Sequence, residues 1–345
     1  MSARRDCTGM KASRALRRNH SSRGTAVAQI AWAGIALVLA SASLNAQEFN
    51  GSRSGVILTL PTSPRSLGLA DASAAVSGDA WALFTSPAQL ARAGTLQVAL
   101  ASEAYLASTQ LSAIALALPA FGGTLGVGAT LLDYGTIREI ASSVPGAEGV
   151  ETGRTWAAQD NAVVVGYARA LGSTRAVRVG ATVSALHSQI ADLSASGVAG
   201  SFGAAWSGGS GWHVGGALQH IGPAITLGAT SGELPLLARI AVGAPTRTVR
   251  GFDVRPMAEL RFVRGGGEAV AVAAEATWRS EGGRSLAFRG GYTLRSDDGD
   301  DRSPVSFGIG TGIGPIELDY AIERFETIDQ VTHRLGVRYA RRATR

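Results

Sequence analysis

The sequence predicts an all-β protein: a transmembrane antiparallel β-barrel of about 14 strands with a short N-terminal helical plug in the lumen. Three observations lead to this fold class. From about residue 95 onward, apolar and polar residues alternate with a period of two. This pattern indicates β-strands, in which successive side chains point to opposite faces. Long and short connections alternate between these segments, which is typical of outer-membrane barrels. Beyond residue 46 no apolar run is long enough for a membrane-spanning helix, so any crossing must use strands.

The first 46 residues are expected to be a signal peptide. Basic residues up to Arg23 precede the apolar run Ala26 to Ala42, and small and polar residues follow. This is the order of a secretory signal, with cleavage after Ala42 or Ala46. A transmembrane anchor is the alternative, but a run of about 17 residues is short for a helix that spans a bilayer. The sequence therefore predicts a signal peptide at 1–46, an N-terminal extension and plug at 47–94, and an outer-membrane barrel at 95–341.

The charge balance depends on this leader. The whole chain has 32 basic and 26 acidic residues, but seven of the basic and one of the acidic residues lie before residue 47. The remaining chain is neutral, which argues against nucleic acid as a partner. Cys7 and Lys11 are the only cysteine and the only lysine, so the mature protein has neither a thiol nor a lysine amine for covalent chemistry.

Each strand of the barrel is predicted from a segment with this alternation. In Pro315 to Glu323, for example, Ile316 and Leu318 lie on one face and Glu317 and Asp319 on the other. The fourteen predicted strands are 95–105, 108–119, 122–134, 158–170, 174–188, 198–208, 211–221, 234–246, 252–264, 269–279, 284–295, 304–313, 315–324 and 330–341. The predicted long loops are 135–157, 189–197, 222–233 and 296–303. A soluble β-sandwich also alternates apolar and polar faces and is the alternative, but the alternating loop lengths favour the barrel.

Charged residues recur on the faces of the late strands that are predicted to point inward. They are Arg239, Arg255, Glu259, Arg261, Glu275, Arg289, Glu317, Asp319, Arg334 and Arg338. Opposite charges on neighbouring strands can pair across them. A polar permeation path is the alternative, but a selective pore should have one dominant sign of charge. The near balance therefore favours a charge network that packs against a plug.

Residues 64–92 interrupt the strand pattern. This stretch is rich in alanine, has a proline near each end and is expected to form short helical turns around Gly78 and Asp79. It is too polar for lipid and too apolar for free solution, and it precedes the first strand. The sequence therefore predicts a plug that folds into the lumen.

A family resemblance rests first on this stretch. The motif residues are Arg65, Gly68, Asp79, Ser86, Pro87, Ala88 and Leu90. With later elements such as Leu218 to Pro223 and Leu234 to Leu236, the chain resembles the PorV/PorQ family of outer-membrane barrels, within the FadL-like superfamily, over about residues 60–341. Ser86 stands where that family has Asn, and a serine at this position is expected to cap a short helix with its hydroxyl.

The resemblance implies two roles of different classes. PorV/PorQ-like proteins are similar to components of type IX protein secretion, which bind exported proteins or a surface-attachment complex. FadL-like relatives carry hydrophobic small molecules through a plugged barrel. The resemblance therefore implies a secretion or attachment component of the cell outer membrane, with outer-membrane lipid and exported proteins as partners. The alternative is a transporter with a hydrophobic ligand.

No pattern in the sequence indicates an enzyme, a metal site or a cofactor. The five histidines lack close metal-ligand spacing, and neither a nucleophile elbow nor a phosphate-binding loop occurs. Glu317 and Asp319 would suit acid–base chemistry in principle. On a strand with charged neighbours, however, they are better explained as partners in lumen salt bridges.

Overall fold

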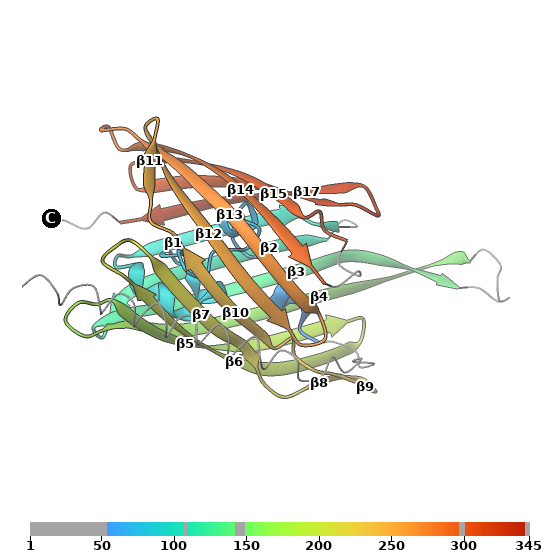
Figure 1. Ribbon diagram of the computed structural model, residues 1–345. Helices are drawn as coiled ribbons and strands as arrows, with labels where there is room; N and C mark the ends of the chain where they lie inside the picture. Colours follow the sequence, from blue (N-terminus) through green and yellow to red (C-terminus); the bar gives the residue numbers. More distant parts are fainter. Residues whose placement is uncertain (1–53, 107–108, 142–148, 297–300, 342–345) are drawn as a thin grey trace, which may run out of the picture. The chain divides into compact units, whose positions relative to one another are not determined.

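A computed structural model of the chain describes residues 54–106, 109–141, 149–296 and 301–341 (Figure 1). The predicted signal peptide lies outside these residues. The described part begins with short helical elements, which are the 3₁₀-helix η1 (Val56–Thr59), the helices α2 (Pro64–Leu67) and α3 (Ala82–Thr85), and the 3₁₀-helix η2 (Pro87–Arg92). Residues 54–96, which contain all four, are called the N-terminal segment below.

The rest of the described chain is almost entirely strands. They are β1 (Gln97–Ala104), β2 (Gln110–Ala120), β3 (Gly123–Ala141), β4 (Val150–Leu171), β5 (Val177–Ile190), β6 (Leu193–Ser207), β7 (His213–Ile221), β8 (Ile225–Leu227), β9 (Thr230–Gly232), β10 (Leu237–Gly243), β11 (Arg247–Val249), β12 (Phe252–Val263), β13 (Gly267–Arg279), β14 (Arg284–Arg295), β15 (Val305–Ile313), β16 (Ile316–Phe325) and β17 (Gln330–Ala340).

Fourteen of these strands form one closed antiparallel ring. Each pairs with its neighbours in chain order from β1 to β7, then β10 and β12 to β17, and the ring closes because β1 also pairs with β17. β8 and β9 form a separate hairpin, and β11 is a short addition to β12. The predicted antiparallel β-barrel of about 14 strands is therefore confirmed.

The two faces of the ring differ in chemistry. Large apolar side chains such as Leu100, Val163, Phe307 and Leu335 are exposed on the outside, whereas small, polar and charged side chains are buried on the inside. In a sandwich the apolar face would be the buried one, so that alternative is wrong. An apolar outer face and a polar inner face are what a transmembrane barrel requires. Within the described residues, no helix has both the length and the apolar character to span a bilayer.

The two ends of the barrel are named by the chain. The terminal end is the end where β1 begins and β17 ends, and the loop end is the opposite one.

Two predicted long loops are wrong. β3 and β4 run on as a paired hairpin beyond the rest of the rim (Figure 1), so most of 135–157 is strand, and the predicted loop 189–197 is a tight turn at Ala191 and Asp192.

Candidate functional site in the lumen

The N-terminal segment lies against the inner face of the barrel. Its apolar side chains pack on small residues of the wall: Trp81, Leu83 and Leu90 against alanines of β1 and β2, and Leu69 to Val76 against Ala241, Met257 and Ala271. Wall residues with small side chains leave room for a second layer of chain inside the ring. The segment therefore fills the middle of the lumen by close packing.

Glycines of the wall make the closest of these contacts. A Cβ on Gly180 would lie 2.5 Å from the Pro87 carbonyl oxygen, and a Cβ on Gly68 would lie 2.9 Å from the Cα of Gly308. Real Cβ atoms do not approach other atoms so closely, so only glycine fits. The wall glycines in contact with the segment, called the inner glycines, are Gly126, Gly128, Gly166, Gly180, Gly203, Gly215, Gly243, Gly291, Gly308 and Gly336.

One tight turn of the segment presents a carboxylate to the wall. Ser63 caps α2 by accepting a hydrogen bond from the Ser66 amide (3.3 Å), and the chain then turns through Ala70 and Asp71, which have φ of 51° and 60°. The Ser66 hydroxyl donates to Asp71 Oδ1 (2.6 Å), and the Asp71 amide donates to the Ser66 carbonyl oxygen (2.8 Å). Aspartate tolerates this left-handed conformation better than most residues. The turn therefore fixes the position of the Asp71 carboxylate.

Asp71 is the centre of the first ion-pair cluster. Its Oδ2 lies 2.8 Å from Arg239 Nη2 and 3.1 Å from Arg261 Nη1. Arg239 also pairs with Glu259 (3.0 Å), which accepts a hydrogen bond from the Ala74 amide (3.0 Å). β10 and β12 thus hold the segment through buried charges of both signs. Each charge has a partner of opposite sign, and the additional hydrogen bonds help to offset the cost of removing the charges from water.

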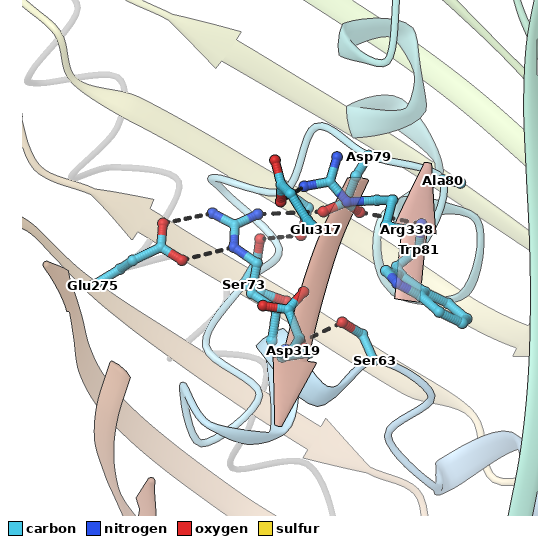
Figure 2. Close-up of polar contacts among 12 residues, drawn as sticks. Ser63, Ser73, Asp79, Ala80, Trp81, Glu275, Glu317, Asp319 and Arg338 are labelled. Atoms are coloured by element: carbon cyan, nitrogen blue, oxygen red, sulfur yellow. Dashed lines mark hydrogen bonds and ion pairs between the residues drawn. The ribbon is translucent and has the colours of Figure 1, made fainter. Parts of the chain in front are cut away.

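Arg65 is the centre of the second cluster. Its guanidinium donates two bonds of 2.8 Å to Glu275 and a third, of 3.3 Å, to Asp79 (Figure 2). Glu275 also accepts a bond from Arg289 (2.7 Å), which pairs in turn with Asp319 (2.6 Å). A fork-like bidentate pair adds geometric specificity to charge attraction, so α2 is held in one orientation against β13.

The third cluster lies at the seam where β1 meets β17. Arg334 and Glu103 are directly opposite each other in the register, and Arg334 Nε donates to Glu103 (2.9 Å). Arg334 also contacts the Pro61 carbonyl oxygen of the segment, and Arg338 pairs with Glu317 on β16. Of the predicted lumen charges, all but Arg255 are paired with an opposite charge in the described structure.

The residues of the predicted motif are distributed along the segment. Arg65 and Asp79 form the second cluster, Gly68 touches β15, and Pro87, Ala88 and Leu90 of η2 lie against β3, β5 and β6. The expected role of Ser86 is wrong. Ser86 occupies the N-cap position of η2, but its hydroxyl makes no capping bond and is buried without a partner among the described residues.

The environment of Asp71 predicts an acid-dependent release of the segment. Burial acts to raise the pKa of Asp71, but Arg239, Arg261 and the Ser66 hydroxyl outweigh it and lower the pKa to about 2. A carboxyl with a lowered folded-state pKa adds stability above its unfolded pKa, near 4, and loses that stability as the pH falls through the folded value. We expect pepsin to cleave within residues 64–92 only as the pH falls from about 4 to about 2. Asp71→Asn should be cleaved already at pH 4, and equal cleavage of both proteins there would contradict the prediction.

A cavity of about 510 Å³ lies above the segment, towards the loop end. Its walls combine apolar side chains, including Leu60, Tyr105 and Phe325, with charged ones such as Arg261. Beside it, an apolar cluster joins the segment to the wall. The cluster consists of Ile57, Leu111, Leu132, Ala162, Leu186, Ala195, Ala199, Ile225 and Leu234, with Leu58, Leu60, Tyr134 and Leu227 packed on it. Leu60 belongs to both, so the cavity borders this packed cluster, which is called the apolar compartment below.

The barrel wall is incomplete next to this compartment. β7 pairs with β6 only as far as Gly200 and Ile221, with a bulge before that point, and the part of β6 from 193 to 199 pairs only with β5. On the outer face a depression of about 610 Å³ occupies this place. On the inner face Ile225 of β8 fills the space over Gly197. The β8–β9 hairpin thus lies between the outer depression and the rest of the apolar compartment, and Leu186 lines the depression while belonging to that compartment.

Three comparisons with known proteins bear on this arrangement. No family model matches the sequence, and no curated protein matches it. Among solved structures, the toluene transporter TodX of Pseudomonas putida superposes with a TM-score of 0.57, at 9% identity, over 83% of this chain and 100% of TodX. A Pseudomonas aeruginosa FadL homologue gives a TM-score of 0.51, at 11% identity, over 81% of this chain and 98% of that one. The chain shares their barrel fold. At these identities the likeness concerns the barrel fold alone, and neither of these two structures is of a PorV or PorQ protein.

Several functional residues were not predicted from the sequence. Asp71 and Glu103 are central to two ion-pair clusters, yet they are isolated acids in apolar stretches. No contact with the N-terminal segment was predicted for the inner glycines. A signal was present, since glycines recur at inward positions of nine of the fourteen ring strands, which are β3 to β7, β10, β14, β15 and β17. Within the described residues no cluster of three or more His, Cys, Asp or Glu is placed to hold a metal ion.

Proposed function

We propose that the protein is a non-enzymatic outer-membrane channel that admits a small hydrophobic compound, with the N-terminal segment as its plug. The apolar outer face supports a place in the outer membrane, reached through the predicted cleaved signal peptide. The barrel fold shared with hydrocarbon channels supports transport over the secretion role that the PorV/PorQ resemblance implies. That secretion role would need an exported protein as partner.

The incomplete wall at β6 is the observation that carries this proposal. Entry of a hydrophobic compound into a water-filled path is unfavourable in free energy. An opening from the apolar outer face into an apolar compartment keeps the compound out of water. Ile225 and its hairpin lie between the outer depression and the rest of the compartment. Displacement of the β8–β9 hairpin would therefore join the two. In this proposal the plug closes the rest of the lumen to water and ions.

A disulfide between β6 and β8 tests the proposed route. A Cβ on Gly197 would lie 4.0 Å from the Ile225 Cβ, which is within the range that a disulfide bridges. The one native cysteine, Cys7, lies in the predicted signal peptide. We expect cells that produce the oxidised Gly197→Cys/Ile225→Cys variant to lose uptake of radiolabelled toluene, because the hairpin can no longer move, and to regain it after reduction.

The two single-cysteine variants are the matched controls, and they should retain toluene uptake under the same oxidation. The bridge itself is verified by mass spectrometry of the purified barrel. Wild-type uptake through a fully bridged barrel would show that this hairpin is not the gate. Absence of toluene uptake by the unmodified protein would instead count against a hydrocarbon substrate.

A further inference from the structure

Three arginines at the terminal end of the lumen differ from the others. The inward-facing Arg65, Arg239, Arg261, Arg289 and Arg334 each pair with a carboxylate. Arg92, Arg178 and Arg255 make no ion pair with any described carboxylate. Their hydrogen bonds in the described structure are to neutral hydroxyls, from Arg178 Nη2 to Ser207 (2.8 Å) and from Arg255 Nε to Thr246 (3.0 Å).

The fold places these three side chains at the same end of the lumen. η2 lies across β5 with Pro87 over Gly180, and Arg178 is two residues from Gly180 on the same inner face. Arg92 ends η2, and its side chain packs on Gly78, where an added Cβ would lie 3.2 Å from the Arg92 Cβ. Arg255 faces Glu275 across the sheet, but Glu275 is already bound by Arg65 and Arg289.

Arg92 and Arg178 have no carboxylate partner in the described structure. Arg178 is only 5% exposed, and both its Nε and Arg92 Nη1 are buried without a hydrogen-bond partner in the described structure. Burial, and then the charges of Arg178, Arg255 and Arg65, lower the pKa of Arg92 to about 10. Buried cations without a counter-charge are costly, whereas an anion that binds several guanidinium groups forms strong charge-assisted hydrogen bonds. Arg92 and Arg255 remain partly exposed, so an anion from the aqueous phase at this end can reach them.

We propose that Arg92, Arg178 and Arg255 form a binding site for an oxyanion, a phosphate or carboxylate group, at the terminal end of the lumen. His213 belongs to its surroundings, because its Nδ1 shares the Ser207 hydroxyl (2.8 Å) that Arg178 also binds. A ligand there would link η2 of the segment to β5 and β12. It would thus hold the plug from the end opposite to the proposed hydrophobic route.

Calorimetric titration of the detergent-purified full chain with inorganic phosphate, and separately with acetate, tests the site. We expect saturable binding of at least one of the two anions, with one site per chain. Removal of one of the guanidinium donors, in Arg92→Gln or Arg178→Gln, should weaken that binding roughly tenfold or more. Arg284→Gln is the matched control, because Arg284 is an exposed arginine at the same end and its loss should leave the affinity unchanged.

Two outcomes would overturn the site: no saturable binding of either anion, or affinities equal in the wild-type protein and in both variants. Heat-modifiable migration of each variant in a detergent gel verifies that the barrel is folded. The titration does not depend on toluene uptake, so failure of the anion site and failure of the proposed transport are distinguishable.

Discussion

Replacement of Gly291 by valine is expected to displace the N-terminal segment from the barrel. A Cβ at Gly291 would lie 2.7 Å from the Ala70 Cβ and 2.8 Å from the Leu69 carbonyl carbon. Backbone and a short side chain cannot rotate out of the way, so the segment must move. Overpacking of this kind costs about 1–3 kcal/mol, and the move also separates Asp71 from Arg239 and Arg261.

Thiol labelling measures this displacement. Ser77→Cys places a buried cysteine in the segment, and the one native cysteine, Cys7, lies in the predicted signal peptide. The introduced cysteine should resist a maleimide in the otherwise unchanged protein and react after Gly291→Val. Gly290→Val is the matched control, since Gly290 neighbours Gly291 on β14 and a Cβ there meets nothing within 4 Å. Equal labelling of the two valine variants would show that the inner glycines do not hold the segment in place.

Removal of Arg334 should weaken the closure of the barrel. Arg334 and Glu103 are 1% exposed and lie opposite each other across the seam between β1 and β17. Arg334→Met leaves Glu103 buried without its counter-charge, a change that costs about 3–5 kcal/mol. We expect the temperature at which the barrel loses its folded migration in a detergent gel to fall markedly.

The double variant Arg334→Met/Glu103→Leu separates charge from packing. With both charges gone, an apolar pair of similar volume should recover most of the lost stability, and the double-variant cycle gives the coupling free energy directly. A double variant no more stable than Arg334→Met alone would mean that Arg334 acts chiefly through its contact with Pro61 of the segment.

The period of two in the sequence was sufficient to predict the ring of strands, because each strand has one lipid face and one lumen face over its membrane-spanning length. It failed for β3 and β4, where the hairpin leaves the barrel and neither face must be apolar. The predicted loop 135–157 was therefore mostly strand. The loop 189–197 failed for a similar reason, since polar strand ends such as Ser194 and Ser196 resemble a loop.

The inward charges were predictable one by one, but their partners were not. Glu103 and Arg334 are 231 residues apart in the chain, and their pairing depends on the register at which the ring closes. Asp71 faces Arg239 and Arg261 only because the segment turns at Ala70 and Asp71 with positive φ. An alternating pattern contains no information about such a turn, and so it could not predict the ion-pair clusters.

The N-terminal segment precedes β1 in the chain, yet its contacts come from strands around the whole ring, from β3 to β17. The ring has no packed core of its own, because its large apolar side chains face outward and its inner face is lined by small residues. The segment supplies that core: a single stretch of chain packs on the inner face of strands on several sides of the ring, so its loss would remove packing from all of them at once.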